Sequence, residues 1–200
     1  MTTVVYGTSA SGNCHKVRMV LDITGTPYAW REVDILQAGT RSPEFLRLNP
    51  NGKVPVVVLD DGTALAESNA ILWYFGEGTR LLPDDRLGRA QMLQWMFFEQ
   101  YTHEPAIAVA RFICAFLKRS DDPRLPELTK RGDAAFGVME RHLAAHEYFA
   151  GNTLTIADLA LFAYTHKAAD GGFDLDRYPA VSAWLARCRR HRGVTEMPTP

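Results

Sequence analysis

The sequence predicts a mixed α/β domain followed by an all-helical domain. Over the first 79 residues, short runs of β-branched and aromatic residues alternate with segments of helical spacing, in the order β-α-β-α-β-β-α. The turn Asp60-Asp61-Gly62 is too short for a crossover connection, so the strands on either side of it must be antiparallel within a mixed sheet. Strand patterns disappear after residue 86, and we therefore expect domains at residues 1–79 and 86–200.

Each element of the first domain follows from a local pattern. Ser42 before Pro43 predicts the start of a short helix, because proline is favoured in the first helical turn. Gly25 and Pro27 end the first helix. In chain order we expect a strand over 3–6, a helix over 14–24, a strand over 28–33, a helix from 43, a hairpin with strands 55–59 and 63–65, and a helix over 68–75.

The second domain keeps apolar residues at helical spacing. Thr155 and Asp158 fit a capping box, in which two side chains satisfy the free N–H groups at a helix start. A long helix from Arg89 onward should bend near Pro105, because proline lacks an N–H and frees backbone groups of the preceding turn.

Composition excludes several functions. Lys and Arg total 22 against 23 Asp and Glu, so the net charge of −1 does not favour nucleic acid or an anionic membrane surface as a partner. The three cysteines are odd in number, widely spaced and without the clustering of metal ligands, which predicts reduced thiols and no metal site. With neither a basic leader nor a membrane-spanning stretch in view, we expect a cytoplasmic protein.

Four motifs stand in order along the chain, and these are Ser11-Gly12-Asn13-Cys14-His15-Lys16-Val17-Arg18, Asn49-Pro50-Asn51-Gly52-Lys53-Val54-Pro55, Ala66-Glu67-Ser68-Asn69-Ala70-Ile71 and Leu154-Thr155-Ile156-Ala157-Asp158. Together they resemble the glutathione transferase superfamily. The resemblance covers nearly the full chain and implies a thioredoxin-like first domain, glutathione as co-substrate without a metal, and a homodimer typical of detoxification enzymes.

Glutathione carries two carboxylates, one ammonium and one thiol, and the motifs offer a partner of each kind. Glu67 can accept the ammonium, while Ser68 and the free N–H groups at its helix start suit the γ-glutamyl carboxylate. Lys53 can meet the glycyl carboxylate. The resemblance implies a cis bond between Val54 and Pro55, with the backbone of Val54 pairing with the cysteinyl unit.

The thiol needs a hydrogen-bond donor, because the thiolate is the nucleophile and a free thiol titrates near 8.5. Ser11 is the first candidate, in a position similar to the catalytic serine of theta and zeta class transferases. Zeta enzymes carry Ser-Ser-Cys where this chain has Ser11-Gly12-Asn13. Asn13 could donate through its amide, and Cys14 could form a mixed disulfide with glutathione. For Tyr6 we expect packing within its strand.

The electrophile should bind between the loop at Ala10 and the long aromatic-rich helix of the second domain. Tyr101 and Arg111 are the candidate substrate contacts on that helix. His103, next to the predicted bend, is expected at the surface or at a helix cap.

The leading function is therefore an enzyme that transfers an alkyl or aryl group of a hydrophobic electrophile to glutathione. One alternative is a glutathione-dependent peroxidase or disulfide reductase, working through Cys14 or through two glutathione molecules. Another alternative is a non-catalytic interaction protein of the same fold, since a fold does not guarantee its chemistry.

Overall fold

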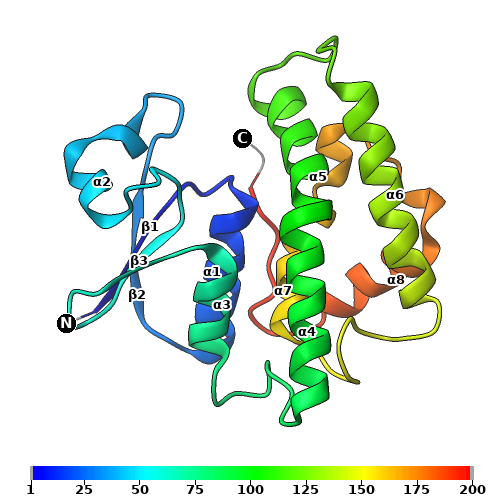
Figure 1. Ribbon diagram of the computed structural model, residues 1–200, viewed down its shortest axis with the longest axis horizontal. Coiled ribbons are helices and arrows are strands. Elements are labelled where there is room, and N and C mark those ends of the chain that lie inside the picture. The colour runs from blue at the N-terminus through cyan, green and yellow to red at the C-terminus, as the bar shows by residue number, and fades with distance from the viewer. Residues whose placement is uncertain (1, 199–200) are drawn as a thin grey trace.

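A four-stranded mixed sheet forms the first part of the chain in the computed structural model, which describes residues 2–198 (Figure 1). Its strand order is β2-β1-β3-β4, with β1 parallel to β2 and antiparallel to β3, and with β3 antiparallel to β4. The strands are β1 (Thr3–Gly7), β2 (Tyr28–Glu32), β3 (Val56–Val58) and β4 (Ala64–Ala66). The predicted mixed sheet is confirmed, and its antiparallel hairpin turns at Asp60-Asp61-Gly62.

Helices cover both faces of this sheet. The helices α1 (Gly12–Thr24) and α3 (Ser68–Gly76) lie on one face, and the short α2 (Pro43–Leu48) lies on the other (Figure 1). Because side chains alternate along a strand, Val5 and Val57 enter the main core, whereas Tyr6 and Val56 pack in a second cluster around Phe45. Tyr6 is thus a packed strand residue, as expected from the sequence.

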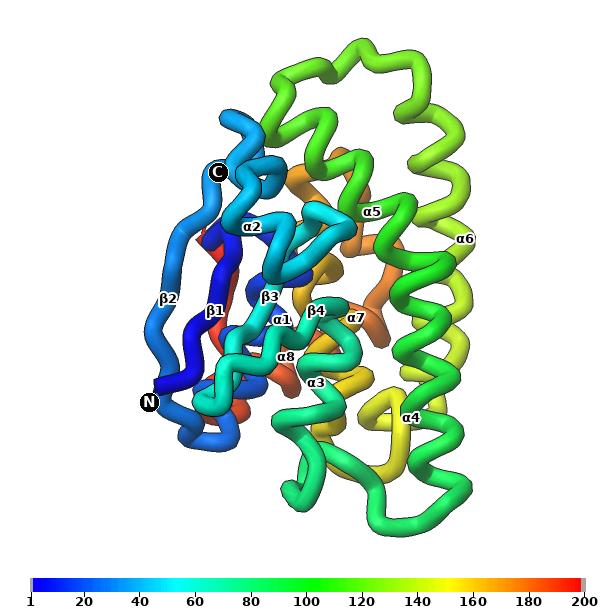
Figure 2. Tube along the Cα trace, turned by 60° about the vertical axis from the view of Figure 1, so that its left-hand side comes forward, coloured from blue at the N-terminus to red at the C-terminus, as the bar shows by residue number. Residues whose placement is uncertain are grey.

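All further regular structure from Arg86 onward, within the described residues, is helical. In Figure 2, α4 and α5 follow one another as a single long path beside α6. Helix α7 packs against both α1 and α4, so it joins the helical part to the first domain. The helices are α4 (Arg86–Phe98), α5 (Glu104–Arg111), α6 (Leu125–Leu143), α7 (Ile156–Thr165) and α8 (Pro179–Cys188), with short 3-10 turns at Gly39–Arg41, Ala168–Gly171 and Leu175–Arg177.

A π-helical turn, Glu99–His103, connects α4 to α5 next to Pro105, where the sequence predicted a bend. The N–H of Glu104 donates to the carbonyl of Glu99, five residues back, which gives the wider turn. A second π-helical turn, Phe112–Phe116, follows α5. None of the helices in the described part of the chain is long and apolar enough to cross a membrane.

The capping box predicted at the start of α7 is present. The carboxylate of Asp158 accepts the N–H of Thr155 at 2.9 Å, the N–H of Phe149 at 3.1 Å and the indole N–H of Trp184 at 3.0 Å. Asp158 and Trp184 are fully buried, so all three donors depend on this carboxylate.

Replacing Asp158 with Ala leaves these buried donors without a partner, and we expect the free energy of unfolding to fall by about 3–5 kcal/mol. Urea denaturation followed by circular dichroism measures the change. Asp85, which caps α4 at the surface through the N–H of Gly88, provides the matched control. Asp85→Ala should cost only about 1 kcal/mol, and equal losses in the two variants would contradict the assignment of Asp158 as a shared acceptor.

Candidate active site

A polar hollow of about 220 Å³ lies between the first domain and the π-helical turn. Five of the residues predicted to bind glutathione line this hollow, namely Lys53, Val54, Pro55, Glu67 and Ser68. The remaining lining residues are Asn13, Asn49, Gln100 and Glu104. Residues that are far apart in the sequence thus line one hollow, and they include both basic and acidic side chains.

The loop before β3 is shaped by Asn49, whose side chain is buried. Its amide donates to the carbonyl of Lys53 at 2.8 Å, and its Oδ1 accepts the N–H of Asn51 at 3.1 Å. These bonds fix the loop so that Lys53 stands at the rim of the hollow with its side chain exposed. The Val54–Pro55 bond that follows is cis, as the motif implied.

Glu67 and Ser68 form the wall opposite this loop. Glu67 has φ of 68°, in the left-handed region that non-glycine residues rarely adopt, and it directly precedes α3. Strained backbone of this kind persists where the surrounding structure enforces it, often at binding sites. Ser68 is the first residue of α3, so free helical N–H groups and a hydroxyl face the hollow together.

A buried ion pair lies directly behind Ser68. Lys16 of α1 and Glu99 of the π-helical turn are both inaccessible to solvent, and their charged atoms are 2.7 Å apart. The ammonium of Lys16 also donates to the hydroxyl of Ser68 at 3.4 Å and to Oδ1 of Asn69 at 3.3 Å. Asn69 in turn donates to Glu99 at 3.1 Å. The pair therefore fixes the start of α3 against the helical domain.

Asn13 extends this network toward the centre of the site. Its Oδ1 accepts the hydroxyl of Ser68 at 3.2 Å, and its Nδ2 donates to Glu104 at 3.3 Å. Its backbone N–H donates to the hydroxyl of Tyr164 at 3.3 Å. The neighbouring Gly12 lies under the Tyr164 ring, where a Cβ would come within 2.6 Å of it, so only glycine allows this close approach.

An apolar hollow of about 240 Å³ adjoins the polar one. Ser11 and Ala10 contribute to it from the loop before α1, together with residues of α5 and the second π-helical turn. Glu104 lines both hollows. The other lining residues are Ile35, Ala108, Val109, Arg111, Phe112, Phe116 and Tyr164. Ser11 and Asn13 are two positions apart in the first motif, but Ser11 lines the apolar hollow and Asn13 lines the polar one.

Arg111 contributes to the apolar hollow, as predicted, although its side chain is only 2% exposed. Its guanidinium donates to Asp170 at 3.1 Å and to the carbonyl of Ala10 at 2.8 Å. Arg111 therefore also holds the loop that carries Ser11. Tyr101, the other candidate contact, is 86% exposed and does not appear among the described residues that line either hollow.

Cys14 lies beneath this site without access to solvent. Its sulfur accepts the N–H of Thr8 at 3.4 Å. Burial raises the pKa of the Cys14 thiol to about 11, even though a hydrogen bond to Ser11 favours the thiolate. Cys14 is thus protonated and packed in the core at neutral pH. Cys114 and Cys188 are also free thiols.

The structure corrects the expectation of a surface position for His103, which occupies the N-cap position of α5 but makes no capping hydrogen bond through its side chain. Its ring is fully buried in the helical domain and shares a hydrogen bond of 2.9 Å with the hydroxyl of Thr165. Burial lowers the pKa of His103 to about 3, and the positive charge of Lys16 acts in the same direction. The imidazole is therefore neutral. No sequence pattern indicates its partner Thr165, which is 62 residues away.

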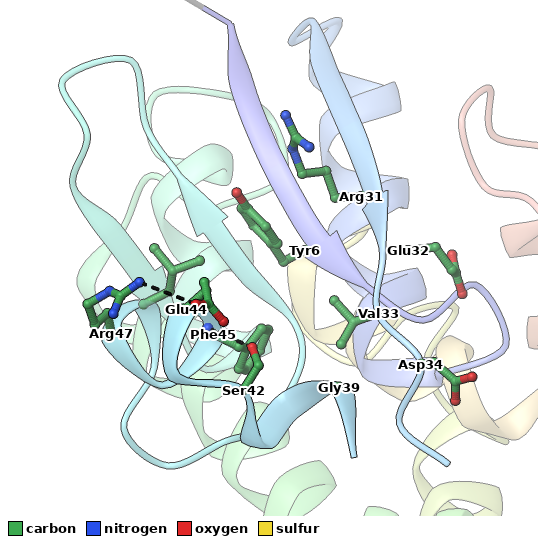
Figure 3. Close-up of a pocket in the computed structure, with 11 residues that line it drawn as sticks. Tyr6, Arg31, Glu32, Val33, Asp34, Gly39, Ser42, Glu44, Phe45 and Arg47 are labelled. Carbon is green, nitrogen blue, oxygen red and sulfur yellow. Dashed lines mark hydrogen bonds and ion pairs between the residues drawn. The ribbon is translucent and has the colours of Figure 1, made fainter. Parts of the chain in front are cut away.

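A larger hollow, of about 580 Å³, lies on the opposite face of the sheet between β2 and α2 (Figure 3). Tyr6, Ser42 and Phe45 line it, and Arg47 beside them pairs loosely with Glu44 at 3.8 Å. No residue of the four motifs contributes to this hollow. The two smaller hollows, where the predicted residues converge, are therefore the candidate active site. Among residues 2–198, no grouping of His, Cys, Asp and Glu could hold a metal ion.

Comparisons with known proteins agree with this geometry. The family model of the glutathione S-transferase N-terminal domain matches residues 10–77, and that of the C-terminal domain matches residues 122–187. A glutathione S-transferase structure from Pseudomonas fluorescens is 48% identical, covers 98% of this chain and 99% of its own, and superposes with a TM-score of 0.96. This chain belongs to the glutathione S-transferase superfamily. The resemblance inferred from the four motifs is thereby confirmed.

Two further members of the superfamily are informative. The glutathione S-transferase structure from Xanthobacter autotrophicus is 50% identical, covers 99% of this chain and 98% of its own, and has a TM-score of 0.96. A glutathione transferase from Pseudomonas putida is 27% identical, covers 96% of this chain and 88% of its own, and has a TM-score of 0.85. The latter was solved with one glutathione disulfide bound per subunit.

Replacing Lys16 with Met should lower the free energy of unfolding by about 3–5 kcal/mol, because the carboxylate of Glu99 then remains buried without a counter-charge. Urea denaturation measures the loss. The double variant Lys16→Met, Glu99→Leu removes both charges and should regain much of the stability. Arg189→Met, which breaks the exposed pair with Glu196, is the control and should change the midpoint little. A double variant no more stable than Lys16→Met would contradict this interpretation.

Proposed function

We propose that this chain is an enzyme that binds glutathione in the polar hollow and transfers it to a hydrophobic electrophile held in the apolar hollow. One observation carries the proposal. Lys53, Val54, Glu67 and Ser68, the residues that the motifs predicted for the two ends of glutathione, line a single hollow that adjoins an apolar one. A hollow of this polarity suits a small peptide with charges of both signs.

In this proposal, each charged group of glutathione meets a side chain of opposite charge or a set of hydrogen-bond donors. Lys53 meets the glycyl carboxylate, and the backbone of Val54 pairs with the cysteinyl unit. Ser68 and the helical N–H groups of α3 bind the γ-glutamyl carboxylate, while Glu67 accepts the ammonium. The buried Lys16 adds positive charge behind Ser68. The thiol then lies where the two hollows meet.

Ser11 remains the first candidate for the donor that stabilises the thiolate. It lines the apolar hollow at the start of α1, where the helix dipole also favours a negative sulfur. Asn13 is the second candidate, since it lines the polar hollow and its amide is already held by Ser68 and Glu104. The burial and raised pKa of Cys14 favour a packing role for that residue over a mixed disulfide.

A second candidate function is a glutathione-dependent peroxidase or disulfide reductase. The glutathione disulfide bound by the Pseudomonas putida relative favours it, since a disulfide is the product of peroxidase chemistry and the substrate of a reductase. Both reactions would use the same sulfur site. We further propose that the enzyme works in the cytoplasm, where reduced thiols such as its own are stable.

Replacing Ser11 with Ala should lower kcat for conjugation of chlorodinitrobenzene by about 100-fold, the usual effect of losing one donor to a developing anion. Glutathione affinity, measured by calorimetry, should change no more than a few fold, because the charged ends are held elsewhere. Asn13→Ala is the parallel variant. Turnover that is unchanged in Ser11→Ala but lost in Asn13→Ala would transfer the donor role to Asn13.

We also propose that two copies of the chain associate as a homodimer through α3 and α4. These helices enclose an apolar hollow of about 410 Å³, lined by Trp73, Leu93, Met96 and Phe97 among others. Phe97 is 67% exposed, and Tyr74 on α3 is 51% exposed. Large apolar side chains gathered at an open surface are typical of an interface.

Replacing Phe97 with Asp places a charge in this surface and should convert the dimer to a monomer, as measured by size-exclusion chromatography with light scattering. Leu87 is equally exposed, at 67%, but does not contribute to the hollow. Leu87→Asp is therefore the matched control and should remain dimeric. A wild-type protein that is monomeric at micromolar concentration would refute the proposed interface.

A further inference from the structure

One hydrogen-bond donor of the guanidinium that borders the apolar hollow has no partner. Arg111, the last residue of α5, donates through Nε to Asp170 at 3.1 Å and through Nη1 to the carbonyl of Ala10 at 2.8 Å. Its Nη2 is buried and finds no acceptor within the part of the chain that the structure describes. Buried donors are nearly always paired, so this exception needs an explanation. An acceptor atom of a ligand in the hollow would complete the set.

The wall next to this guanidinium is aromatic. Phe112 and Phe116 both line the apolar hollow, and their rings stack with centroids 5.3 Å apart. The guanidinium carbon of Arg111 lies 5.4 Å from the centre of the Phe116 ring. Both rings belong to the second π-helical turn, and turns of this rare kind are frequent at functional sites. A flat aromatic ligand can stack on such rings.

The charges that line the apolar hollow are separated along α5. Glu104 and Arg111 both line it, and seven helical positions correspond to about 10 Å along the helix axis. Glu104 bonds to Asn13 on the side of the polar hollow. Asp170, the acidic partner of Arg111, is not among the described residues that line the apolar hollow. The hollow therefore offers positive charge at one end only.

We propose that the electrophile of this enzyme is an aromatic compound that carries a carboxylate, and that Nη2 of Arg111 binds this carboxylate. The inference rests on the proposed transfer of glutathione and names the substrate class for the same site. A carboxylate suits the free donor because hydrogen bonds between two charged groups are about twice as strong as neutral ones. The aromatic ring of the substrate stacks beside Phe112 and Phe116.

The ring of Phe116 controls access to the donor. Nη2 of Arg111 is shielded from solvent, with the Phe116 ring over the guanidinium. Phe116 is only half-buried, so its ring has room to turn aside. Side-chain rotations of this kind are common when a ligand binds. The carboxylate then takes the place that the aromatic ring leaves.

The bonds that change in the reaction do not involve Arg111. A suitable probe is the chloronitrobenzoate whose chlorine is para to the carboxylate and ortho to the nitro group. The thiolate sulfur forms a bond to the ring carbon that carries chlorine, the carbon–chlorine bond breaks, and chloride leaves with both electrons. The thiol proton has already passed to solvent. The contribution of Arg111 therefore depends on the carboxylate and not on the leaving group.

The test compares this chloronitrobenzoate with its methyl ester, which has the same leaving group but no charge. Arg111→Met should lower kcat/KM for the acid about 30-fold more than for the ester, because one hydrogen bond between charged groups is lost. Both substrates meet the same protein, so any general damage to the loop that carries Ser11 cancels in the ratio. Arg111→Lys, which keeps the charge but not the planar fork, should give an intermediate ratio.

The matched control is Arg119→Met. Arg119 is exposed and is not among the described residues that line the apolar hollow. It lies close to Arg111 in the sequence, so its removal changes the net charge of the region by the same amount. The ratio of kcat/KM for acid and ester should remain that of the wild type.

Inhibition of the wild type provides a measurement that needs no variant. Nitrobenzoate has no halide to lose, so it can bind without reacting. It should compete with chlorodinitrobenzene but not with glutathione. Its Ki should be about tenfold below that of methyl nitrobenzoate, because the ester lacks the charged acceptor.

Two results would overturn the inference. Equal losses for acid and ester in Arg111→Met would show that Arg111 only holds the loop that carries Ser11. Competition between nitrobenzoate and glutathione would show that the carboxylate binds in the polar hollow instead. Failure of the proposed function is distinguishable, because the wild type would then conjugate no electrophile, chlorodinitrobenzene included, and the inference would fall with it.

Discussion

The buried ion pair between Lys16 and Glu99 is the constraint on which the site depends. Removing two charges from water carries a large desolvation cost, which is offset only when each charge has a well-placed partner and further hydrogen bonds. Here Ser68 and Asn69 supply those bonds, and both are at the start of α3. The position of α3, whose first residue lines the polar hollow, is therefore set by a contact between the two domains.

The sequence predicted the fold well because the signals for its elements are local. Strands, helix starts and the hairpin turn are encoded by residues close to one another, such as Ser42, which caps α2 through the N–H of Phe45, and the pair Thr155 and Asp158. These signals act within three or four positions, so they can be identified without knowledge of the tertiary structure. The mixed sheet followed from the same kind of local evidence.

The site could be predicted only in part. Lys53, Val54, Glu67 and Ser68 belong to motifs, but Gln100, Glu104 and the buried Glu99 come from a helical segment with no such signature. Lys16 and Glu99 are 83 positions apart, and a single sequence treats each as a solvated charge. The sequence also left open whether Ser11 or Asn13 donates a hydrogen bond to the glutathione sulfur, and the reason is different. Ser11 and Asn13 flank a helix start, where positions two apart face different directions, so each reaches a different hollow.

Pro105 links the π-helical turn to the residues that line the polar hollow. Proline in the interior of a helix lacks an N–H and its ring collides with the carbonyl four residues back, so the chain widens into the π-helical turn that ends at His103. Within that region, residues four apart share a face. Glu99 and His103 point into the core, whereas Gln100 and Glu104 point into the polar hollow. The turn next to this proline thus places the buried Glu99 behind the polar hollow and Glu104 in its lining.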